Sequence, residues 1–127
     1  MGVCRYLAII ALAASTLVGI SSVEARREST AALPPIAAAE LPKEARITLA
    51  RIHDNGPFPY ERDGIAFGNR EGLLPPKPRG YYHEYTVKTP GSRGRGARRL
   101  VCGGETTTLA ECYYSDDHYQ SFKSIRP

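Results

Sequence analysis

Cysteine, long apolar runs and strong net charge are all scarce in this chain of 127 residues. The one extended apolar run, residues 6–20, is shorter than the roughly 20 residues that a membrane-spanning helix needs. No internal repeat is visible, and the length suffices for one domain. The formal net charge of +4 is too small to indicate nucleic-acid binding by itself, although it favours an anionic substrate.

The N-terminus is typical of a secretory signal. Arg5 supplies a positive charge, residues 6–20 are apolar, and Val23-Glu24-Ala25 fits the small-x-small cleavage rule. We therefore expect residues 1–25 to be a signal peptide and the mature protein to be secreted and extracellular, with no membrane attachment after cleavage. The alternative, an uncleaved membrane anchor, requires a longer apolar run. A lipoprotein is excluded because Cys4 precedes the apolar run.

Residues 26–40 contain two prolines and few large apolar side chains. This composition predicts a disordered leader or a trimmed pro-segment. The folded domain is then residues 41–127, which is small enough to benefit from a covalent staple. Signal cleavage leaves only Cys102 and Cys112, and an even pair in an oxidising compartment indicates a disulfide. Two free thiols are the alternative.

The hydrophobic pattern predicts one helix followed by strands. Residues 41–54 repeat apolar side chains at helical spacing, and Gly56 ends the pattern. Aromatic and β-branched residues then predict strands, with a short one at 65–67 and longer ones at 81–87, 97–102, 112–115 and 119–125. The expected fold is α+β, with one N-terminal helix packed on a small twisted antiparallel β-sheet.

Four side chains in the last third of the chain form an acid–base set for phosphodiester chemistry. A carboxylate removes a hydroxyl proton, an imidazolium protonates a leaving oxygen, and guanidiniums stabilise charge on phosphoryl oxygens. The predicted catalytic residues are Glu84, His118, Arg95 and Arg99. RNA cleavage through its own 2'-hydroxyl requires such a set and no metal or other cofactor. Period-two geometry places Arg95 and Arg99 on one strand face if the strand extends that far.

Each of these residues has a simpler interpretation. Glu84 is also compatible with a surface strand carboxylate, and the arginines with a solvated basic strand or an unstructured RNA-binding arm. We expect Asp117 to orient His118 or raise its pKa. His53 near the helix end and His83 on the strand face opposite Glu84 are predicted to be structural.

A short loop upstream has the donors and acceptors to bind guanine. Glu71 is able to accept both donors of the guanine Watson–Crick edge, and the backbone of residues 68–70 is able to donate to O6. Asn69 tolerates a left-handed backbone, and aromatic rings at Phe67 and Tyr119 are able to stack on a purine. The predicted guanine site is Phe67, Gly68, Asn69, Arg70, Glu71 and Tyr119. An ordinary surface loop is the alternative.

Taken together, these stretches resemble the secreted bacterial guanyl-specific ribonucleases of the barnase family, most closely the actinobacterial branch. The resembling stretches are Gly56-Pro57-Phe58-Pro59-Tyr60, residues 67–71, residues 80–87, residues 95–99 and Asp117-His118-Tyr119. The resemblance implies the microbial ribonuclease fold and cleavage of single-stranded RNA 3' of guanosine through a 2',3'-cyclic phosphate. It further implies a monomer and a possible barstar-like proteinaceous inhibitor.

Two features depart from the family pattern. Family members commonly carry a polar side chain where this chain has Gly68, and we expect guanine preference to persist because the family's contact there is through the backbone. The actinobacterial relatives join their termini by a disulfide, so a Cys102–Cys112 bridge is a local variation. The rival functions are a catalytically weak secreted RNA-binding protein and an antibacterial ribonuclease toxin; the intact set of four residues argues against the first.

Overall fold

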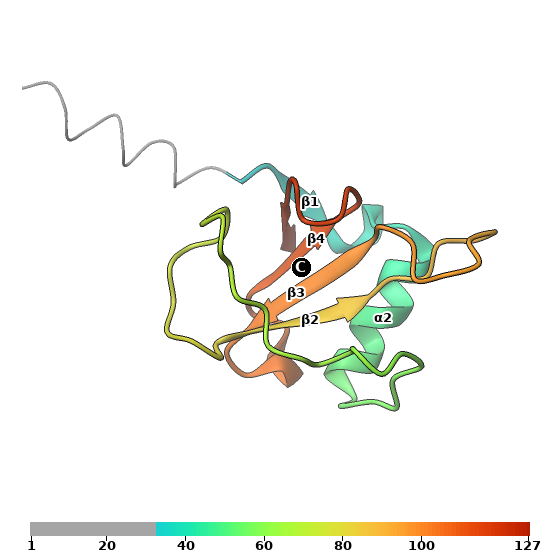
Figure 1. Cartoon of the computed structure of the whole chain (residues 1–127), viewed down its shortest axis with the longest axis horizontal. Coiled ribbons are helices and arrows are strands. Elements are labelled where there is room, and N and C mark those ends of the chain that lie inside the picture. The colour runs from blue at the N-terminus through green and yellow to red at the C-terminus, as the bar shows by residue number, and fades with distance from the viewer. Residues whose placement is uncertain (1–32) are drawn as a thin grey trace, which may run out of the picture.

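The computed structural model describes residues 33–127, so the expected signal peptide and residues 26–32 of the expected leader lie outside the described residues. One α-helix and a five-stranded sheet of order β1-β5-β4-β3-β2 form the fold (Figure 1). No helix within this part of the chain is long and apolar enough to cross a membrane. The elements are β1 (Pro35–Ala37), η1 (Ala38–Glu40), α2 (Lys43–His53), β2 (Tyr82–Thr86), β3 (Arg99–Gly103), η2 (Thr106–Thr108), β4 (Cys112–Ser115) and β5 (Lys123–Arg126).

Helix α2 confirms the prediction for residues 41–54, with shorter ends. Pro42 occupies the N-cap position with extended backbone, Glu44 lies in the first turn, and Asp54 caps the C-terminus. Pro42 suits a helix start because its missing N–H would have no intrahelical partner there. Beyond the helix, Asn55 and Gly56 adopt left-handed backbone, with φ of 60° and 101°, which ends the helical hydrogen bonding.

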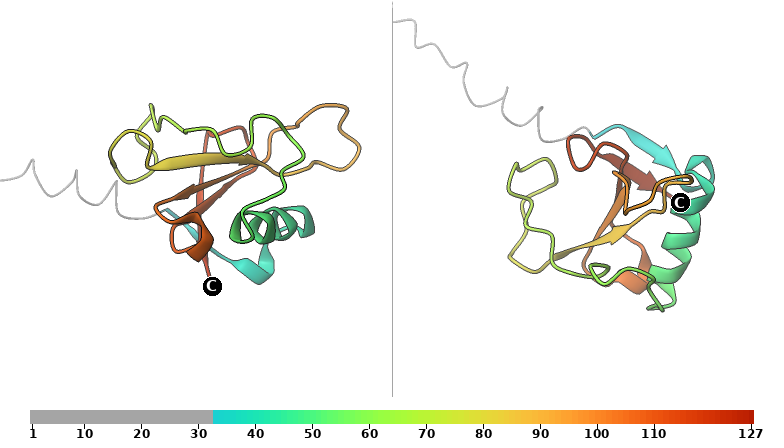
Figure 2. Two further views of the ribbon diagram at one scale, coloured as in Figure 1. Left: turned by 90° about the horizontal axis from the view of Figure 1, so that it is seen from below. Right: turned by 45° about the vertical axis from the view of Figure 1, so that its right-hand side comes forward.

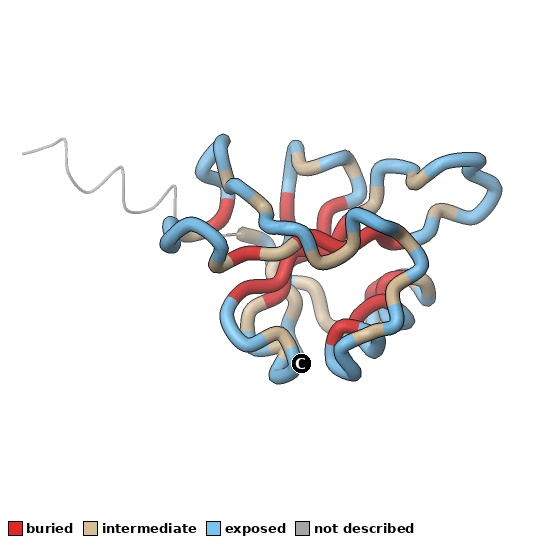
Figure 3. Tube along the Cα trace, turned by 60° about the horizontal axis from the view of Figure 1, so that its bottom comes forward, coloured by how far each residue is buried: buried red, intermediate tan, exposed pale blue. Residues whose placement is uncertain are grey.

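Alternation along the strands gives the sheet two different faces. One face packs its apolar side chains against α2, where Leu49 and Ile52 meet Tyr85, Leu100 and Tyr114. Leu100 of β3 therefore faces the helix. The other face carries a smaller apolar cluster of Leu74, Tyr82, Val101, Tyr113 and Phe122. Figure 2 shows α2 on one side of the sheet and the loops that precede β2 along the other, and Figure 3 shows burial concentrated in the strands and helix.

Residues 35–40, which the sequence places in a disordered leader or a trimmed pro-segment, form β1 and η1 and so are not disordered here. Strand β1 pairs in parallel with β5, in the register Pro35↔Ser124, Ile36↔Ile125 and Ala37↔Arg126. The sheet is therefore mixed rather than wholly antiparallel. Ile36 packs on the helix-side core, and Pro35 is tolerated because β1 is an edge strand. Packing of Ile36 and pairing with β5 therefore order this segment, although its composition did not indicate a strand.

The later strands differ from the prediction mainly at their ends. Strand β4 matches it, and Ala66 forms only an isolated bridge with His83 where a short strand was expected. Strand β3 starts at Arg99 rather than Ala97, and β5 starts at Lys123 rather than Tyr119. Residues before β5 form a turn instead, because His118 and Tyr119 have φ of 55° and 72°.

The predicted disulfide joins Cys102 of β3 to Cys112 of β4. The two residues are direct partners in the antiparallel register, with Cα atoms 4.1 Å apart. Both are buried in the core against α2. The bridge therefore closes the β3–β4 hairpin beneath the helix.

Candidate active site

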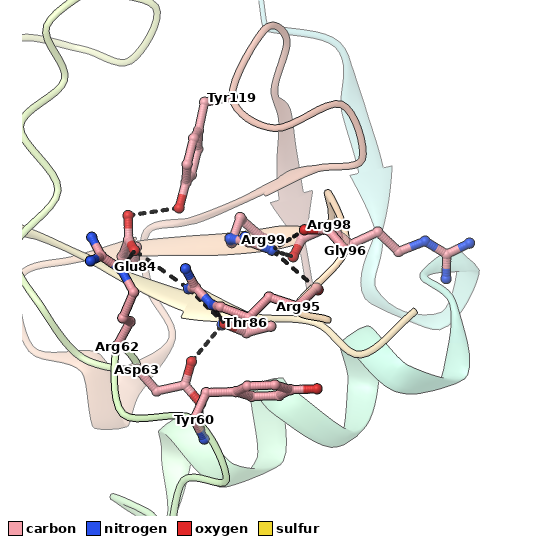
Figure 4. A network of polar contacts seen from close by, with 10 residues as sticks. All are labelled: Tyr60, Arg62, Asp63, Glu84, Thr86, Arg95, Gly96, Arg98, Arg99 and Tyr119. Carbon is pink, nitrogen blue, oxygen red and sulfur yellow. Dashed lines mark hydrogen bonds and ion pairs between the residues drawn. The ribbon is translucent and has the colours of Figure 1, made fainter. Parts of the chain in front are cut away.

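Glu84 lies at the centre of a polar cluster on the sheet face opposite α2 (Figure 4). The residue is only 7% exposed. Its Oε2 accepts a 2.6 Å hydrogen bond from the Tyr119 hydroxyl. Its Oε1 lies 3.6 Å from Nη2 of Arg95 and 3.9 Å from Nε of Arg62. Both carboxylate oxygens are thus oriented by partners, and positive charge lies directly beside a potential proton acceptor.

Arg95 reaches Glu84 from a loop and not from a strand. Arg95 and Arg99 were expected to share one strand face only if the strand extended that far, and it does not, because β3 begins at Arg99. The Arg95 guanidinium is instead fixed by Thr86, whose Oγ1 accepts from Nε at 2.9 Å and from Nη2 at 2.7 Å. Thr86 is fixed in turn because its backbone N–H donates to Oδ1 of Asp63 at 2.7 Å. A loop arginine is therefore held by a buried strand residue.

Arg99 is buried, with 3% of the residue exposed. Its Nη1 donates to the carbonyl oxygens of Gly96 at 3.0 Å and of Arg98 at 2.8 Å, which holds the loop that carries Arg95. The Nε–H of Arg99 makes no hydrogen bond within residues 33–127. A buried guanidinium donor calls for an acceptor, and an anionic oxygen is the strongest one available.

His118 projects from the turn between β4 and β5. Its backbone N–H donates to the Ala97 carbonyl at 3.0 Å, which joins this turn to the arginine loop. The residue is exposed, and its ring centroid lies 5.0 Å from that of Tyr119. Tyr119 therefore contacts both the histidine and Glu84, so residues far apart in the sequence meet at one site.

Asp117 does not hydrogen-bond to His118, contrary to the sequence-based expectation. Its Oδ1 accepts from the Ser115 hydroxyl and the Ser121 N–H, each at 2.9 Å, and its Oδ2 accepts from the Ser121 hydroxyl. These hydrogen bonds, that of the Ser121 side chain above all, lower the pKa of Asp117. Asp117 thus shapes the turn through its hydrogen bonds to Ser115 and Ser121.

Tyr119 has a second role that the sequence did not reveal. It was expected to cover a purine, and its ring does lie 5.0 Å from that of Phe67. Its hydroxyl, however, is bound to Glu84. Burial raises the pKa of Tyr119, and the hydrogen bond to the Glu84 carboxylate raises it further. The phenol therefore remains a donor at neutral pH and fixes the carboxylate.

The loop of residues 67–71 is shaped by Asn69. Its backbone is left-handed, with φ of 48°, as the sequence predicted. Its side chain spans the loop, donating to the Leu74 carbonyl at 3.0 Å and accepting from the Leu74 N–H at 3.1 Å. The Phe67 N–H donates to the Tyr82 carbonyl at 2.8 Å, which fastens the start of the loop to β2. The loop is therefore ordered by its own contacts.

The other predicted guanine-binding residues leave the loop open to a ligand. Arg70 and Glu71 are exposed, and Gly68 has a backbone that does not require glycine. A Cβ at Gly68 would meet nothing nearer than Cγ of Arg70 at 3.6 Å. The loop conformation therefore does not require glycine at position 68, where family members commonly carry a polar side chain.

Three residues of this site escaped the sequence analysis, namely Arg62, Asp63 and Thr86. Arg62 and Asp63 lie in a turn after Pro59, where charged residues usually face solvent. Several hydrogen bonds bring that turn onto β2, among them those from Gly64 N–H to the Glu84 carbonyl at 2.8 Å and from Thr86 N–H to Oδ1 of Asp63 at 2.7 Å. Thr86 lies on the same strand face as Glu84, two residues further along β2, but no sequence pattern indicated that it would fix an arginine.

The remaining histidines lie outside this cluster. His53 is exposed at the end of α2 with its Nδ1 3.0 Å from Asp54. His83 points away from Glu84, and its Nδ1 lies 2.9 Å from the Gly64 carbonyl oxygen. Both fit the structural roles expected of them.

Comparison with known proteins decides the family. A family model described as ribonuclease matches residues 24–126 of the chain. The chain belongs to the ribonuclease family. Among curated relatives of this ribonuclease, guanyl-specific ribonuclease Sa of Kitasatospora aureofaciens is 54% identical over 85 residues, covering 67% of this chain and 85% of that protein. Guanyl-specific ribonuclease St of Saccharopolyspora erythraea is 48% identical over 100 residues, covering 79% and 95%.

Guanyl-specific ribonuclease Sa3 of Kitasatospora aureofaciens is 55% identical over 85 residues, and the match spans 67% of this chain but 58% of that protein. Solved structures of ribonuclease Sa2 give the same fold. Its structure in complexes with mononucleotides has a TM-score of 0.71 and 53% identity, covering 76% of this ribonuclease and 96% of Sa2. Its structure with guanosine-2'-cyclophosphate has a TM-score of 0.69 and 52% identity, covering 76% and 98%.

Within the described chain of this ribonuclease, no three His, Cys, Asp or Glu side chains are arranged to hold a metal ion. What the cluster does present is one buried carboxylate, one exposed imidazole and three guanidiniums. An acceptor and a potential donor of protons thus flank a positively charged surface. This is an arrangement suited to binding and transferring a phosphoryl group.

Proposed function

We propose that this ribonuclease is an exported endoribonuclease that cuts single-stranded RNA 3' of guanosine through a 2',3'-cyclic phosphate, without a metal ion. The observation that carries the proposal is the convergence of Glu84, Arg95, Arg99 and His118 beside the loop of residues 67–71. Guanyl-specific relatives at about half identity support it.

In the first step Glu84 accepts the proton of the guanosine 2'-hydroxyl. The 2'-oxygen attacks phosphorus, the bond to the 5'-oxygen of the next nucleotide breaks, and His118 gives that oxygen a proton. The products are a 2',3'-cyclic phosphate and a free 5'-hydroxyl. The Tyr119 hydrogen bond at 2.6 Å orients the Glu84 carboxylate toward this role.

The arginines stabilise the charge that develops on the phosphoryl oxygens. Arg95 lies 3.6 Å from Glu84 and is anchored on Thr86, and Arg99 keeps its buried Nε–H available. Fixed donors in a partly buried site stabilise such charge more strongly than flexible ones in water. In the slower second step the roles reverse, so that His118 deprotonates water and Glu84 returns the proton.

The loop of residues 67–71 is proposed to read the base. Asn69 orients successive backbone N–H groups, and the exposed Glu71 carboxylate accepts from guanine N1 and its amine. The ring of Phe67, backed by Tyr119 at 5.0 Å, offers a surface for stacking. Adenine would not offer the Glu71 carboxylate this pair of donors. A polar site discriminates strongly between bases because the wrong base leaves its polar groups without hydrogen bonds.

The test uses DNA oligonucleotides that contain a single ribonucleotide, because only that position has the attacking 2'-hydroxyl. In EDTA, the substrate with riboguanosine should be cut at that position and yield a cyclic phosphate by mass spectrometry. Substrates with riboadenosine, ribocytidine or ribouridine should react far more slowly. An absolute need for divalent metal, or equal cutting after all four bases, would overturn the proposal.

A pair of variants separates base recognition from chemistry. Glu71→Ala should lose guanosine nucleotide affinity and the preference for guanosine over adenosine while retaining general cleavage. Its control is Glu61→Ala, another exposed carboxylate outside residues 67–71, which should leave selectivity unchanged. If Glu71→Ala keeps full guanosine selectivity, the loop is not the base-reading site.

Export is tested separately from catalysis. Expression of the full chain in an actinobacterial host should yield extracellular protein that begins at Arg26, as N-terminal sequencing would show. A product retained in cells with an intact N-terminus would remove the export part of the proposal and leave the enzymatic part standing.

A further inference from the structure

A basic groove lies along the guanine loop, and the residues of its other wall, 77–80, play no part in the proposed chemistry. It has a volume of about 570 Å³ and runs between residues 66–70 and residues 77–80, with Tyr82 at the start of β2 as a further wall. Three of its lining residues are basic, namely Arg70, Lys77 and Arg79, and no acidic residue of the described chain lines it. The groove therefore favours an anionic occupant.

The positive charge of this groove is not neutralised by neighbouring carboxylates. None of the ion pairs found within residues 33–127 involves Arg70, Lys77 or Arg79, and all three residues are exposed. Lys77 is placed by the ring of Tyr81, whose centroid lies 5.1 Å from Nζ. The Glu111 carboxylate accepts hydrogen bonds from the hydroxyls of Tyr81, Tyr82 and Tyr113.

The position of the groove relates it to the reaction site. Tyr82, at the groove, and Glu84, at the site, are two residues apart on β2, a rise of about 7 Å. Thr86, which anchors Arg95, comes next in the same direction. In Figure 1 the loop that contains residues 67–80 extends from the start of β2, and the loop of residues 87–98 extends from its end. Residues 66–70 form one wall of the groove, which lies at the Tyr82 end of β2, whereas Thr86 and Arg95 lie at its other end.

A guanosine whose base lies on residues 67–71 and whose 3'-phosphate lies at Glu84 has one other connection to the RNA chain, its 5'-phosphate. We propose that Lys77 and Arg79 bind the two phosphates immediately 5' of the guanosine, so that this ribonuclease prefers sites with an upstream RNA or DNA backbone. This inference rests on the proposed function and adds a subsite to it. Exposed lysine and arginine act here as positioning charges without base preference.

The experiment compares kcat/KM for guanylyl-uridine with that for an oligonucleotide bearing the same guanosine after four deoxythymidines. For the wild-type protein we expect the extended substrate to react about two- to tenfold faster, the range that two exposed ion pairs provide. Lys77→Gln/Arg79→Gln should abolish this gain and leave guanylyl-uridine cleavage unchanged. It should also reduce the salt slope of log kcat/KM by about 1.4, since each single-strand phosphate contact contributes about 0.7.

The control is Lys43→Gln/Arg46→Gln, which removes the same charge from exposed positions on α2 and should retain the gain. A second arm replaces the two upstream phosphates with uncharged methylphosphonates. Wild type should then lose its preference, and the Lys77/Arg79 variant should show no further change.

The outcomes distinguish this inference from the proposed function. If wild type fails to cut guanylyl-uridine, the proposed function fails. If wild type cuts it but gains nothing from the extension, or keeps the gain with methylphosphonates, the subsite does not exist. An equal loss on both substrates in the folded Lys77/Arg79 variant would also overturn it, because the residues would then act on the guanine loop. Circular dichroism of each variant establishes folding.

Discussion

The sheet face that packs on α2 and the face that carries Glu84 are built from alternate residues of the same strands, yet they bury different chemistry. The helix side is filled by apolar groups such as Leu100 and Tyr114 and is closed by the disulfide. The other side buries Glu84 at 7% exposure and Arg99 at 3% exposure. Burying charge is costly unless partners satisfy it. The face against α2 therefore stabilises the fold, and the opposite face presents a preorganised site for an anion.

The comparison implies that mutations on the two faces should fail in different ways. Substitutions against α2 should lower stability while the folded fraction keeps its rate. Substitutions around Glu84 should lower the rate with little loss of stability, since residues kept for function are often neutral or costly for the fold.

Replacing Glu84 should give the greatest loss. Glu84→Gln keeps the shape of the side chain but removes the proton acceptor, so kcat should fall by about 10²- to 10⁴-fold. Guanosine monophosphate binding should be largely retained, because the base contacts lie in residues 67–71. Pre-steady-state cleavage of a single-riboguanosine oligonucleotide and calorimetric titration measure the two quantities.

The pH profile provides a control for that assignment. Wild-type kcat/KM should be bell-shaped, with Glu84 ionised and His118 protonated in the active form. Glu84→Gln should remove the acidic limb, and His118→Gln the alkaline limb. A wild-type rate that climbs steadily to high pH would contradict both roles.

On the opposite face, Leu100→Ala should destabilise the fold by about 2–5 kcal/mol, because it leaves a cavity at a side chain that is fully buried. Urea unfolding measures the change. At low temperature, the folded variant should cleave at close to the wild-type rate. A loss of kcat as large as that of Glu84→Gln in folded protein would show that the two faces are not separable.

Removing the disulfide should have a smaller effect on the same face. The bridge spans a sequence separation of 10, and closing a loop of that size restricts the unfolded chain by about 2–3 kcal/mol. Cys102→Ala/Cys112→Ala should therefore unfold at lower urea and remain active, because Glu84 and His118 lie outside the loop. Mass spectrometry after alkylation without reductant checks the bridge; two alkylated cysteines in active wild-type protein would contradict it.

Sequence patterns were sufficient wherever local periodicity decides structure. Helix α2 and strand β4 lie where apolar spacing and β-branched or aromatic content placed them. The four catalytic candidates do converge, with Glu84 and His118 joined through Tyr119. Their separation in sequence is wide, so convergence was predictable only from the family resemblance.

What the sequence could not reveal depends on distant pairing. Strand β1 exists because Ile36 and its neighbours pair with β5, about ninety residues later by the register Ile36↔Ile125. Arg62 approaches Glu84 because a loop is hydrogen-bonded onto β2. Asp117 satisfies serine donors rather than the histidine next to it. In each case the folded arrangement of the chain determines the partner, and residue type alone does not predict it.

The smallest expected effect concerns Asp117, which lies at the edge of the polar face. Its pKa is lowered in the folded state by hydrogen bonds, first of all from Ser121. A carboxylate with a folded pKa below its unfolded value stabilises the fold above about pH 4, and this contribution is lost as the pH falls through the folded pKa. Asp117→Asn should therefore be less stable than wild type at pH 7, by less than the cysteine variant, and the difference should shrink below pH 4. Thermal melts from pH 7 to pH 2.5 measure it, with Asp116→Asn as the neighbouring control. A stability difference that does not change with pH would mean that the hydrogen bonds to Asp117 do not depend on its charge.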